Sequence, residues 1–312
     1  MTTLVTGASG FIGRRLLRSS DRALVRQPSG FAHEVVGNLL EMRSLDKACL
    51  GIKTVFHCAG YSKVFGTAPK DIYHDVNYLG TVNLLEAAGR AGVKHFIFLS
   101  SVKAMAEPGE KCVDEKWPGE PISPYGISKR AAEEAVIDAG KRFGMHVVNL
   151  RLAMVYGRGV RGSLDRLARG LTAGWFPILP ETGNRRSLIH LDDVVDAIRL
   201  VADCPKANRR TYIVSDSKSY SGRELCESIR SIIPAPRISW QIPEVPMRLA
   251  GKFGDVLRYF SRYPVPISSE LISKLLDSEC YSPRLIEQEL GWRSKVSLKN
   301  GLREMLCHNL PI

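Results

Sequence analysis

The sequence lacks any unbroken apolar run of the roughly 20 residues that a membrane-spanning helix needs. It also lacks a basic leader with a small-residue cleavage region at its start, so we expect no secretory signal and a cytoplasmic protein. The absence of low-complexity segments excludes fibrous and disordered classes. What is present is a globular composition, 44% hydrophobic and 24% charged over 312 residues, which suffices for one large domain or two modest ones.

Metal-ligand spacing is missing too, because none of the seven cysteines forms a C-x-x-C pair or has paired histidines nearby. An odd number of cysteines without such spacing indicates neither a disulfide framework nor a zinc site. We therefore expect reduced thiols, several of them buried in the core, and no bound metal.

The net charge of +12 is not gathered into blocks of like charge or interleaved with aromatic residues. This scatter predicts a general attraction for anionic ligands and no nucleic-acid binding. The segment Met247 to Phe260 separates Arg248 and Lys252 from Phe253 and Leu257 on two helical faces. Membrane-surface helices and helices packed on their own domain share this pattern; we favour the second and expect no membrane association.

Short apolar runs alternate with segments of helical periodicity through the first half of the chain. The expected strands are Thr3–Thr6, Ala23–Arg26, Glu34–Val36, Thr54–Cys58, His95–Leu99 and His146–Leu152. The expected helices are Phe11–Ser19, Ser44–Leu50, Val76–Ala91 and Tyr125–Phe143. This alternation predicts an α/β fold in which a Rossmann-type, doubly wound parallel sheet carries helices on both faces.

Prolines interrupt this rhythm after Gly157 and predict a smaller, mixed C-terminal lobe. Residues 187–214 still contain strand and helix patterns, so we expect this stretch to return to the sheet. The predicted division is a dinucleotide-binding domain of residues 1–157 and 187–214 and a lobe of residues 158–186 and 215–312. A pocket is expected under the lobe, at the carboxyl ends of the strands.

A glycine-rich turn follows the first expected strand and opens the first helix, with its glycines in a G-x-x-G-x-x-G spacing. Glycine lets the backbone approach a pyrophosphate closely, and the helix start offers unpaired N–H groups. We expect this turn to bind a dinucleotide through Gly7, Ser9, Gly10, Phe11, Ile12 and Gly13.

The second expected strand ends at Arg26, where an NAD-selective protein usually carries an acidic residue. A guanidinium there can pair with the 2′-phosphate of NADP, which favours NADP over NAD; a solvated surface arginine is the alternative. Asn38 and Leu39 follow the third strand and are candidates to face the adenine, although a turn asparagine is nearly as good an interpretation.

Tyr125 and Lys129 are placed on one face of a helix by their i, i+4 spacing. A neighbouring ammonium favours the ionised form of a phenol, whose ordinary pKa of about 10 makes it a poor base at neutral pH. Ser101 closes the preceding strand, where its hydroxyl can bind a reacting oxygen. Together these residues predict acid–base chemistry beside a nicotinamide.

With these motifs the chain resembles the extended short-chain dehydrogenase/reductase family, which contains nucleotide-sugar epimerases, dehydratases and reductases. The resemblance covers nearly the whole length. Its motifs are Thr6 to Gly13, Phe56 to Gly60, Val76-Asn77, Leu99 to Ser101, Tyr125-x-x-x-Lys129, Arg151 to Gly157, Arg186 to Asp193 and Leu290 to Trp292.

The resemblance implies that Tyr125 is the acid–base catalyst, that Lys129 tunes it and anchors the nicotinamide ribose, and that Ser101 binds the substrate oxygen. It further implies that Asn77 supports the proton path. Three more residues, by the same resemblance, border the cofactor: Ala59, Gly60 and Val155.

By the same resemblance the C-terminal lobe binds substrate, commonly a nucleoside-diphosphate sugar. Its phosphates would meet basic residues, for which the candidates are Lys103, Arg185 and Arg186. Since many relatives dimerise through two helices of each subunit, we expect a homodimer.

The choice among the family's reactions is narrowed by motifs of dehydratases and epimerases that this sequence does not contain. Dehydratases follow the strand-end hydroxyl residue with Asp-Glu, but Ser101 is followed by Val102-Lys103, so dehydration is not expected. The Asn-Pro and Arg-x-Gly-Asp elements of UDP-hexose epimerases are absent, and Arg26 favours an exchangeable NADPH. We therefore favour a 4-ketoreductase of nucleotide sugars, in which hydride reaches the ketone carbon as Tyr125 protonates the oxygen.

Three alternatives stay open. The first is a UDP-sugar 4-epimerase with tightly bound NAD, which would use the same three residues. The others are a reductase of a non-sugar ketone and a non-catalytic NADP-binding regulator.

Overall fold

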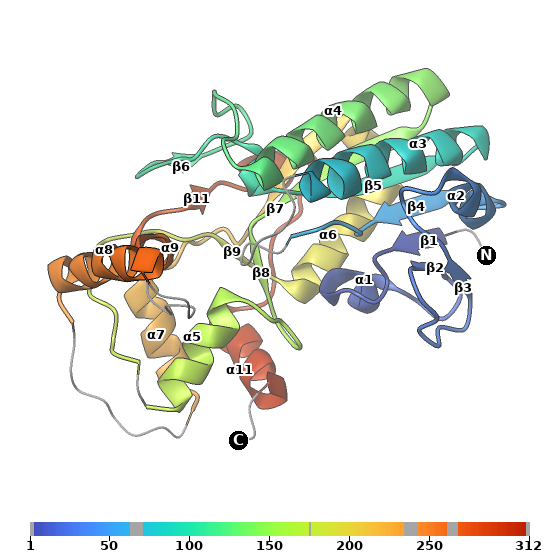
Figure 1. The fold of residues 1–312 in the computed structure, drawn as a ribbon. Helices are drawn as coiled ribbons and strands as arrows, with labels where there is room; N and C mark the ends of the chain where they lie inside the picture. Colours follow the sequence, from blue (N-terminus) through green and yellow to red (C-terminus); the bar gives the residue numbers. More distant parts are fainter. Residues whose placement is uncertain (1–2, 63–70, 175, 234–241, 261–267, 310–312) are drawn as a thin grey trace.

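The computed structural model describes residues 3–62, 71–174, 176–233, 242–260 and 268–309 (Figure 1). Its centre is a seven-stranded sheet in which every strand pair is parallel, in the order β10-β7-β5-β4-β1-β2-β3. The strands are β1 (Thr3–Thr6), β2 (Arg22–Val25), β3 (Glu34–Val36), β4 (Thr54–His57), β5 (His95–Ser101), β7 (His146–Leu152) and β10 (Arg210–Val214). The expected doubly wound α/β fold is confirmed.

The strands are apolar on both sides because both faces of the sheet are covered by helices. On one face α2 (Met42–Cys49), α3 (Gly80–Arg90) and α4 (Pro124–Phe143) share a buried core with Phe96 and Phe98. On the other face α1 (Phe11–Leu16) and α6 (Leu191–Asp203) enclose a second core around Ile97 and Leu99. The alternation of these β5 side chains follows the period of two of a strand.

The sheet order reverses between β1 and β4, which lie side by side although β2 and β3 separate them in sequence. In open α/β sheets this switch point leaves a crevice outside the carboxyl ends of the strands. The glycine-rich turn follows β1 and Ala59-Gly60 follows β4, so both flank this crevice.

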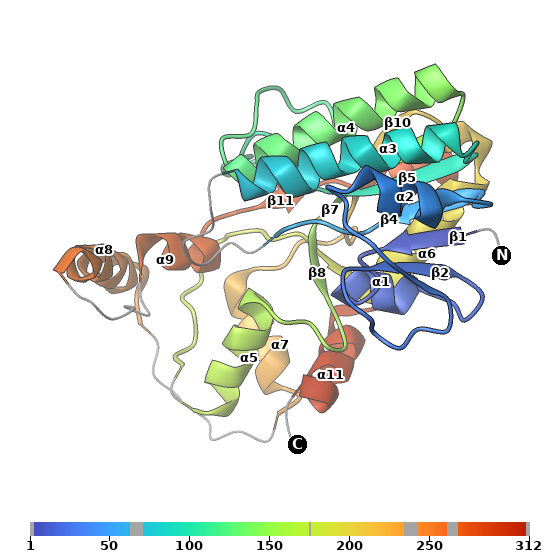
Figure 2. The same cartoon turned by 45° about the vertical axis from the view of Figure 1, so that its right-hand side comes forward.

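A third core lies beyond the carboxyl ends of the strands, below and to the left of the sheet in Figure 1 and Figure 2. It is built largely from α5 (Ser163–Thr172), α7 (Gly222–Arg230), α8 (Glu244–Phe260), α9 (Ser269–Leu276) and α11 (Leu298–Asn309). Two short parallel pairs accompany it, β8 (Met154–Tyr156) with β9 (Leu188–His190) and β6 (Cys112–Val113) with β11 (Cys280–Tyr281). The remaining elements are η1 (His74–Leu79), η2 (Val102–Ala104), η3 (Pro205–Ala207) and α10 (Arg284–Leu290).

Cys112 and Cys280 form a disulfide that joins β6 to β11, with their Cα atoms 4.4 Å apart. The expectation that all seven thiols are reduced is therefore wrong. The two residues are 168 positions apart in sequence, and only the parallel pairing of the two strands brings them together. Of the other cysteines, Cys49 is buried, and burial raises its pKa to about 12, which fits the expected core role.

Helix α8 corrects a second expectation. Its apolar residues Phe253 and Leu257 are 64% and 40% exposed, so the helix does not pack its apolar face on its own domain. The buried positions include two glycines, and a Cβ at Gly251 would lie 3.0 Å from the Cα of Ser269 in α9. Small residues at that contact let the helices approach closely and leave the large side chains outside. Among the described residues, no helix is long and apolar enough to cross a bilayer.

Candidate active site

The turn between β1 and α1 is closed by glycines that cannot be replaced without moving the backbone. Gly7 has φ +67°, and a Cβ there would lie 2.7 Å from the amide nitrogen of Ala59 at the end of β4. Gly10 donates its amide to the Gly7 carbonyl at 2.8 Å, and a Cβ at Gly13 would overlap that carbonyl. Ser9 and Gly10 are exposed, which leaves the outer side of the turn open to a ligand.

A chain of hydrogen bonds, which the sequence analysis missed, links this turn to the next helix. The Ala59 amide donates to Thr6 Oγ1 at 3.1 Å, and Thr6 Oγ1 lies 2.7 Å from His57 Nδ1. On the other side of the ring, His57 Nε2 lies 2.9 Å from Thr81 Oγ1, which donates to the Asn77 carbonyl at 2.6 Å. Burial lowers the pKa of His57 to about 3, so the ring is neutral and joins the two threonines as donor and acceptor.

Asn77 lies in the π-helical segment η1 and is buried to 1% exposure. Its side chain accepts the Tyr61 amide at 2.7 Å and donates to the Tyr61 carbonyl at 3.0 Å and to Ser128 Oγ at 3.1 Å. A Cβ at Gly60 would lie 3.1 Å from Asn77 Oδ1 and 3.5 Å from Lys129 Nζ. Asn77 thus holds the Gly60–Tyr61 backbone against α4. π-helical turns such as η1 often occur at functional sites.

Helix α4 begins where it can present Tyr125 to the end of β5. Ser123 caps it by accepting the Gly126 amide at 3.0 Å, and Pro124 occupies the first turn. A Cβ at Gly126 would overlap the Lys103 carbonyl, so glycine allows the helix start to touch the segment that follows Ser101. Ser101 and Tyr125 line the same cavity, and the Ser101 hydroxyl lies near enough to lower the pKa of the phenol.

The protonation of Tyr125 and Lys129 is controlled mainly by burial. Burial raises the pKa of Tyr125, while the hydrogen bond with Ser101 opposes this rise. Burial also lowers the pKa of Lys129 to about 8, and its Nζ donates to the Leu99 carbonyl at 2.7 Å. Burial sets the direction of the shift in Tyr125 because it disfavours the charged phenolate. That Lys129 tunes the acidity of Tyr125 stays a prediction.

Beneath these residues lies a buried ion pair between Glu133 of α4 and Arg151 of β7, at 2.7 Å. Ser100 donates to Glu133 Oε1 at 2.5 Å, so three polar side chains satisfy one another inside the sheet domain. Glu133 follows Lys129 by four residues, as Lys129 follows Tyr125. This repeated helical spacing is the one sequence signal that points to Glu133.

A cavity of about 200 Å³ brings the central candidates together. Of the predicted site residues, six line it: Ile12, Gly60, Ser101, Tyr125, Lys129 and Val155. Six further residues line it that were not predicted as site residues, and all but Ser62 lie in the motifs listed above: Cys58, Ser62, Leu99, Ser100, Leu152 and Ala153.

The predicted adenine-side residues follow β2 and β3 in the chain. Arg26 is exposed and comes directly after β2. Asn38 is also exposed, and its Oδ1 accepts the Leu40 amide at 3.1 Å, as in the turn interpretation. Leu39 is buried in the core of the sheet domain.

The predicted phosphate-binding residues are engaged by partners within the chain. Lys103 Nζ lies 2.5 Å from Glu279 Oε1, and Arg186 Nη2 lies 3.2 Å from Glu279 Oε2. Arg186 is 5% exposed and also donates to the Asp277 carbonyl at 3.1 Å. Arg185 donates to the Glu110 carbonyl at 2.8 Å. A diphosphate would have to compete with Glu279 for two of these cations.

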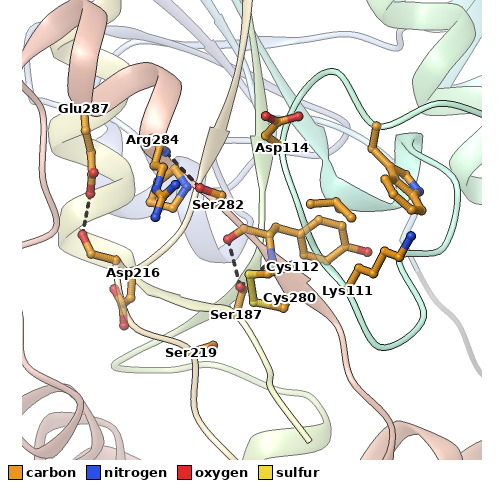
Figure 3. Close-up of a pocket in the computed structure, with 15 residues that line it drawn as sticks. Lys111, Cys112, Asp114, Ser187, Asp216, Ser219, Cys280, Ser282, Arg284 and Glu287 are labelled. Carbon is orange, nitrogen blue, oxygen red and sulfur yellow. Dashed lines mark hydrogen bonds between the residues drawn. A yellow bond between two sulfur atoms is a disulfide. The ribbon is translucent and has the colours of Figure 1, made fainter.

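A second hollow, of about 440 Å³, lies beside the disulfide, and none of the residues around it also lines the smaller cavity. Figure 3 shows Asp114, Arg284 and the disulfide around it. Asp216 also lines this hollow and is 5% exposed, and burial raises its pKa to about 7.

The residues at the crevice fit a bound dinucleotide. A side chain at Gly7 would collide with Ala59, which follows β4, and a side chain at Gly13 would collide with the carbonyl of Gly7 in the turn itself. From there Ile12 leads into the cavity that holds Tyr125 and Lys129. A pyrophosphate on the turn would thus place the other end of the molecule beside the catalytic candidates.

Comparisons with known proteins agree with this geometry. Residues 3–215 match the NAD dependent epimerase/dehydratase family. The UDP-glucose 4-epimerase of Vibrio cholerae is 30% identical over 96% of this chain and 93% of its own length. The N-acetyl-alpha-D-glucosaminyl-diphospho-ditrans,octacis-undecaprenol 4-epimerase of Escherichia coli O157:H7 is 26% identical over 97% of this chain and 93% of its own.

Among solved structures, MoeE5 in complex with UDP-glucose and NAD superimposes with a TM-score of 0.77 at 25% identity, covering 98% of this chain and 97% of that one. The match over more than half of the chain and the resemblance of its motifs lead to one conclusion. The chain belongs to the NAD dependent epimerase/dehydratase family and is an enzyme of the extended short-chain dehydrogenase/reductase type.

Proposed function

We propose that the protein is a 4-epimerase of a hexose carried on a diphosphate, with NAD as its cofactor. The observation that carries this proposal is the single cavity in which Ser101, Tyr125 and Lys129 meet at the end of the glycine-lined crevice. The two 4-epimerases that align over nearly the whole chain support the reaction type. We therefore place epimerisation ahead of the 4-ketoreductase that the sequence analysis favoured.

The chemistry that the nicotinamide would supply when bound is reversible acceptance of a hydride from carbon 4 of the sugar. Tyr125 takes the proton of the 4-hydroxyl as the carbonyl forms; the keto sugar then turns over, so that the hydride returns to its opposite face while Tyr125 gives the proton back. Ser101 lines the same cavity as Tyr125, so its hydroxyl lies where it can hold the same sugar oxygen. Burial keeps water away from the keto sugar between the two steps.

Lys129 provides the positive charge that the buried phenolate needs. Its pKa of about 8 leaves the ammonium largely protonated at neutral pH, and the carboxylate of Glu133 opposes the loss of that proton. The phenol must be ionised before it can take the proton of the 4-hydroxyl. Burial, which raises its pKa, works against that step, and the ammonium of Lys129 works for it.

NAD is proposed because an epimerase regenerates its cofactor in every cycle, and MoeE5, which aligns over nearly the whole chain, binds NAD. Arg26 remains the one residue in favour of NADP, through its place after β2. Lys103 and Arg186 are proposed to meet the diphosphate by exchanging part of their pairing with Glu279.

The two aligned epimerases differ in what carries the sugar diphosphate, a nucleoside in one and undecaprenol in the other. The reaction at carbon 4 is the same for both carriers.

The test is an assay with UDP-glucose and UDP-galactose, and separately with their N-acetylated forms, without added reductant. An epimerase interconverts each pair with no net consumption of NADH or NADPH. A ketoreductase consumes one NADPH for each 4-keto sugar and does not interconvert the pairs, and that result would overturn the proposal.

A further inference from the structure

Helix α8 presents a stripe of large apolar side chains to solvent. Val245, Leu249, Phe253 and Val256 are 67%, 59%, 64% and 54% exposed, and Leu257 is 40% exposed. These positions follow the i, i+4, i+8 spacing of one helical face. Five of the eleven most exposed large hydrophobic residues among the described part of the chain thus lie on one helix.

A helix that packs on its own domain buries its large apolar side chains, whereas α8 exposes them. The buried positions in the described side chains of α8 are Met247, Gly251 and Gly254, of which two have no side chain to bury. Gly251 packs against Ser269 and Ile272 of α9. Because the apolar stripe contributes nothing to that contact, packing of α8 on α9 does not explain it.

The position of α8 and the charge of the chain favour a membrane surface as the partner of this helix. In both views α8 lies at the outer end of the molecule, away from β1 to β3 (Figures 1 and 2). On α8 itself Lys252 and Asp255 are both exposed, and Arg248 is paired with Glu244 and Asp277, so the attraction for an anionic surface comes from the net charge of +12 of the whole chain. An exposed apolar helix face on a basic protein is suited to the interface of an anionic bilayer.

One residue connects this helix to the proposed diphosphate site. Asp277 Oδ1 pairs with Arg248 of α8 at 2.8 Å, and the Asp277 carbonyl accepts from Arg186 at 3.1 Å. Asn184, two residues before Arg186, also donates to the carbonyl of Leu275 in α9 at 3.2 Å. The α8–α9 pair therefore borders the loop that carries the candidate phosphate ligands.

We infer that α8 docks the protein on an anionic lipid bilayer and that the diphosphate of the sugar substrate is carried by a membrane lipid. This inference rests on the proposed function for the sugar chemistry, whereas the docking itself does not depend on it. A lipid carrier keeps its chain in the bilayer while its sugar diphosphate extends toward Arg186.

The test for docking is flotation of the purified protein with phosphatidylglycerol-containing vesicles and with phosphatidylcholine vesicles. The wild type should float with the anionic vesicles, and added salt should weaken this binding. Phe253→Glu should lower the partition onto these vesicles about tenfold or more, because one anchor is lost and a negative charge is added. Leu50→Glu is the matched control: Leu50 is 73% exposed but lies in the sheet domain, so this variant should float like the wild type.

Three results would overturn the docking. One is a wild type that stays unbound, and another is a Phe253→Glu variant that floats equally well. The third is a wild-type oligomer that Phe253→Glu dissociates without any vesicle binding, which would assign the stripe to a second copy of the chain.

The substrate class is tested with a polyprenyl-diphospho-N-acetylhexosamine in the same vesicles. Wild type should epimerise it, and Phe253→Glu should lose about tenfold in rate on the vesicles while its rate on a soluble UDP-sugar, if present, is unchanged. If neither sugar is epimerised, the proposed function fails while flotation still decides the docking. Equal rates of both proteins on the vesicle-borne sugar would contradict the lipid carrier.

Discussion

Gly126 lies so close to the Lys103 carbonyl that a Cβ at this position would overlap it. The contact holds the start of α4 against the segment after β5, and so fixes Tyr125 beside Ser101. The glycine of the Pro124-Tyr125-Gly126 motif therefore allows the start of a helix and the segment after a strand to meet without a side chain between them.

Gly126→Ala should therefore reduce activity far more than stability. A displacement of Tyr125 on the order of 1 Å costs about 100-fold in rate, whereas the fold loses only one loop contact. Measured kcat and thermal melting should separate the two effects. Gly162→Ala, at a glycine with open space around its Cβ position, should leave kcat near the wild-type value. Equal activity of both variants would contradict the role of the contact.

Glu133 should matter to stability as well as to the site. Glu133→Gln leaves Arg151 buried with an uncompensated charge, which should cost about 3–5 kcal/mol in the free energy of unfolding. Its neighbour Glu134 is exposed and pairs with Arg130, so Glu134→Gln should cost less than about 1 kcal/mol. Urea unfolding of both variants measures the difference, and similar costs would show that the buried pair contributes no more than a surface one.

Loss of Glu133 should also change the activity profile with pH. Glu133 raises the pKa of Lys129 against the effect of burial, so without it the ammonium should lose its proton at lower pH. The alkaline limb of the kcat profile should then move to lower pH in Glu133→Gln. If the alkaline limb does not move, Lys129 is not the group whose loss of a proton produces it.

Asp216 should make the protein less stable as the pH rises. Its pKa is raised from 3.8 to about 7 by burial, so the folded state binds the proton more tightly than the unfolded chain does. Stability should therefore fall between pH 4 and pH 7 and level off above that range. Since one pKa unit corresponds to about 1.4 kcal/mol, Asp216→Asn should gain on the order of 4 kcal/mol at alkaline pH.

The measurement is thermal melting of Asp216→Asn and wild type at acidic and alkaline pH. The gain should appear only at the alkaline end. Asp114→Asn, an exposed carboxylate at the same hollow, is the control and should show no such pH-dependent gain. A pH-independent effect of Asp216→Asn would contradict the role assigned to burial.

Arg26 is the residue through which we expect the protein to distinguish NADP from NAD. Arg26→Asp should shift the ratio of binding constants toward NAD over NADP, because a carboxylate after β2 binds the ribose hydroxyls and repels a 2′-phosphate. Titration of the purified protein with NADH and NADPH, followed by fluorescence, measures this ratio. An unchanged ratio would identify Arg26 as a solvated surface residue.

Much of the fold was predictable because its signals are local. Apolar β-branched runs predicted β1, β3 and β7 with the bounds that they have, and the glycine spacing identified the turn after β1. Tyr125 and Lys129 were predictable from one helical turn of sequence. Ser101 was predictable as well, because it closes a continuous apolar run that indicates a strand.

The rest depends on pairs that only the folded chain brings together. Glu133 and Arg151 are on a helix and a strand, and Cys112 and Cys280 meet through two short strands. The outward direction of Phe253 depends on glycines packing against α9. The pKa of Tyr125 also escaped prediction, since spacing shows which charge is near but not how much water is removed.

The most direct test of the central claim is the rate of interconversion of UDP-glucose and UDP-galactose, and of their N-acetylated forms, by wild type and Tyr125→Phe in the presence of NAD. If Tyr125 moves the proton of the 4-hydroxyl, the variant should lose about 100- to 10,000-fold in kcat while it still binds NAD. A Tyr125→Phe variant that interconverts the sugars at the wild-type rate would contradict the account.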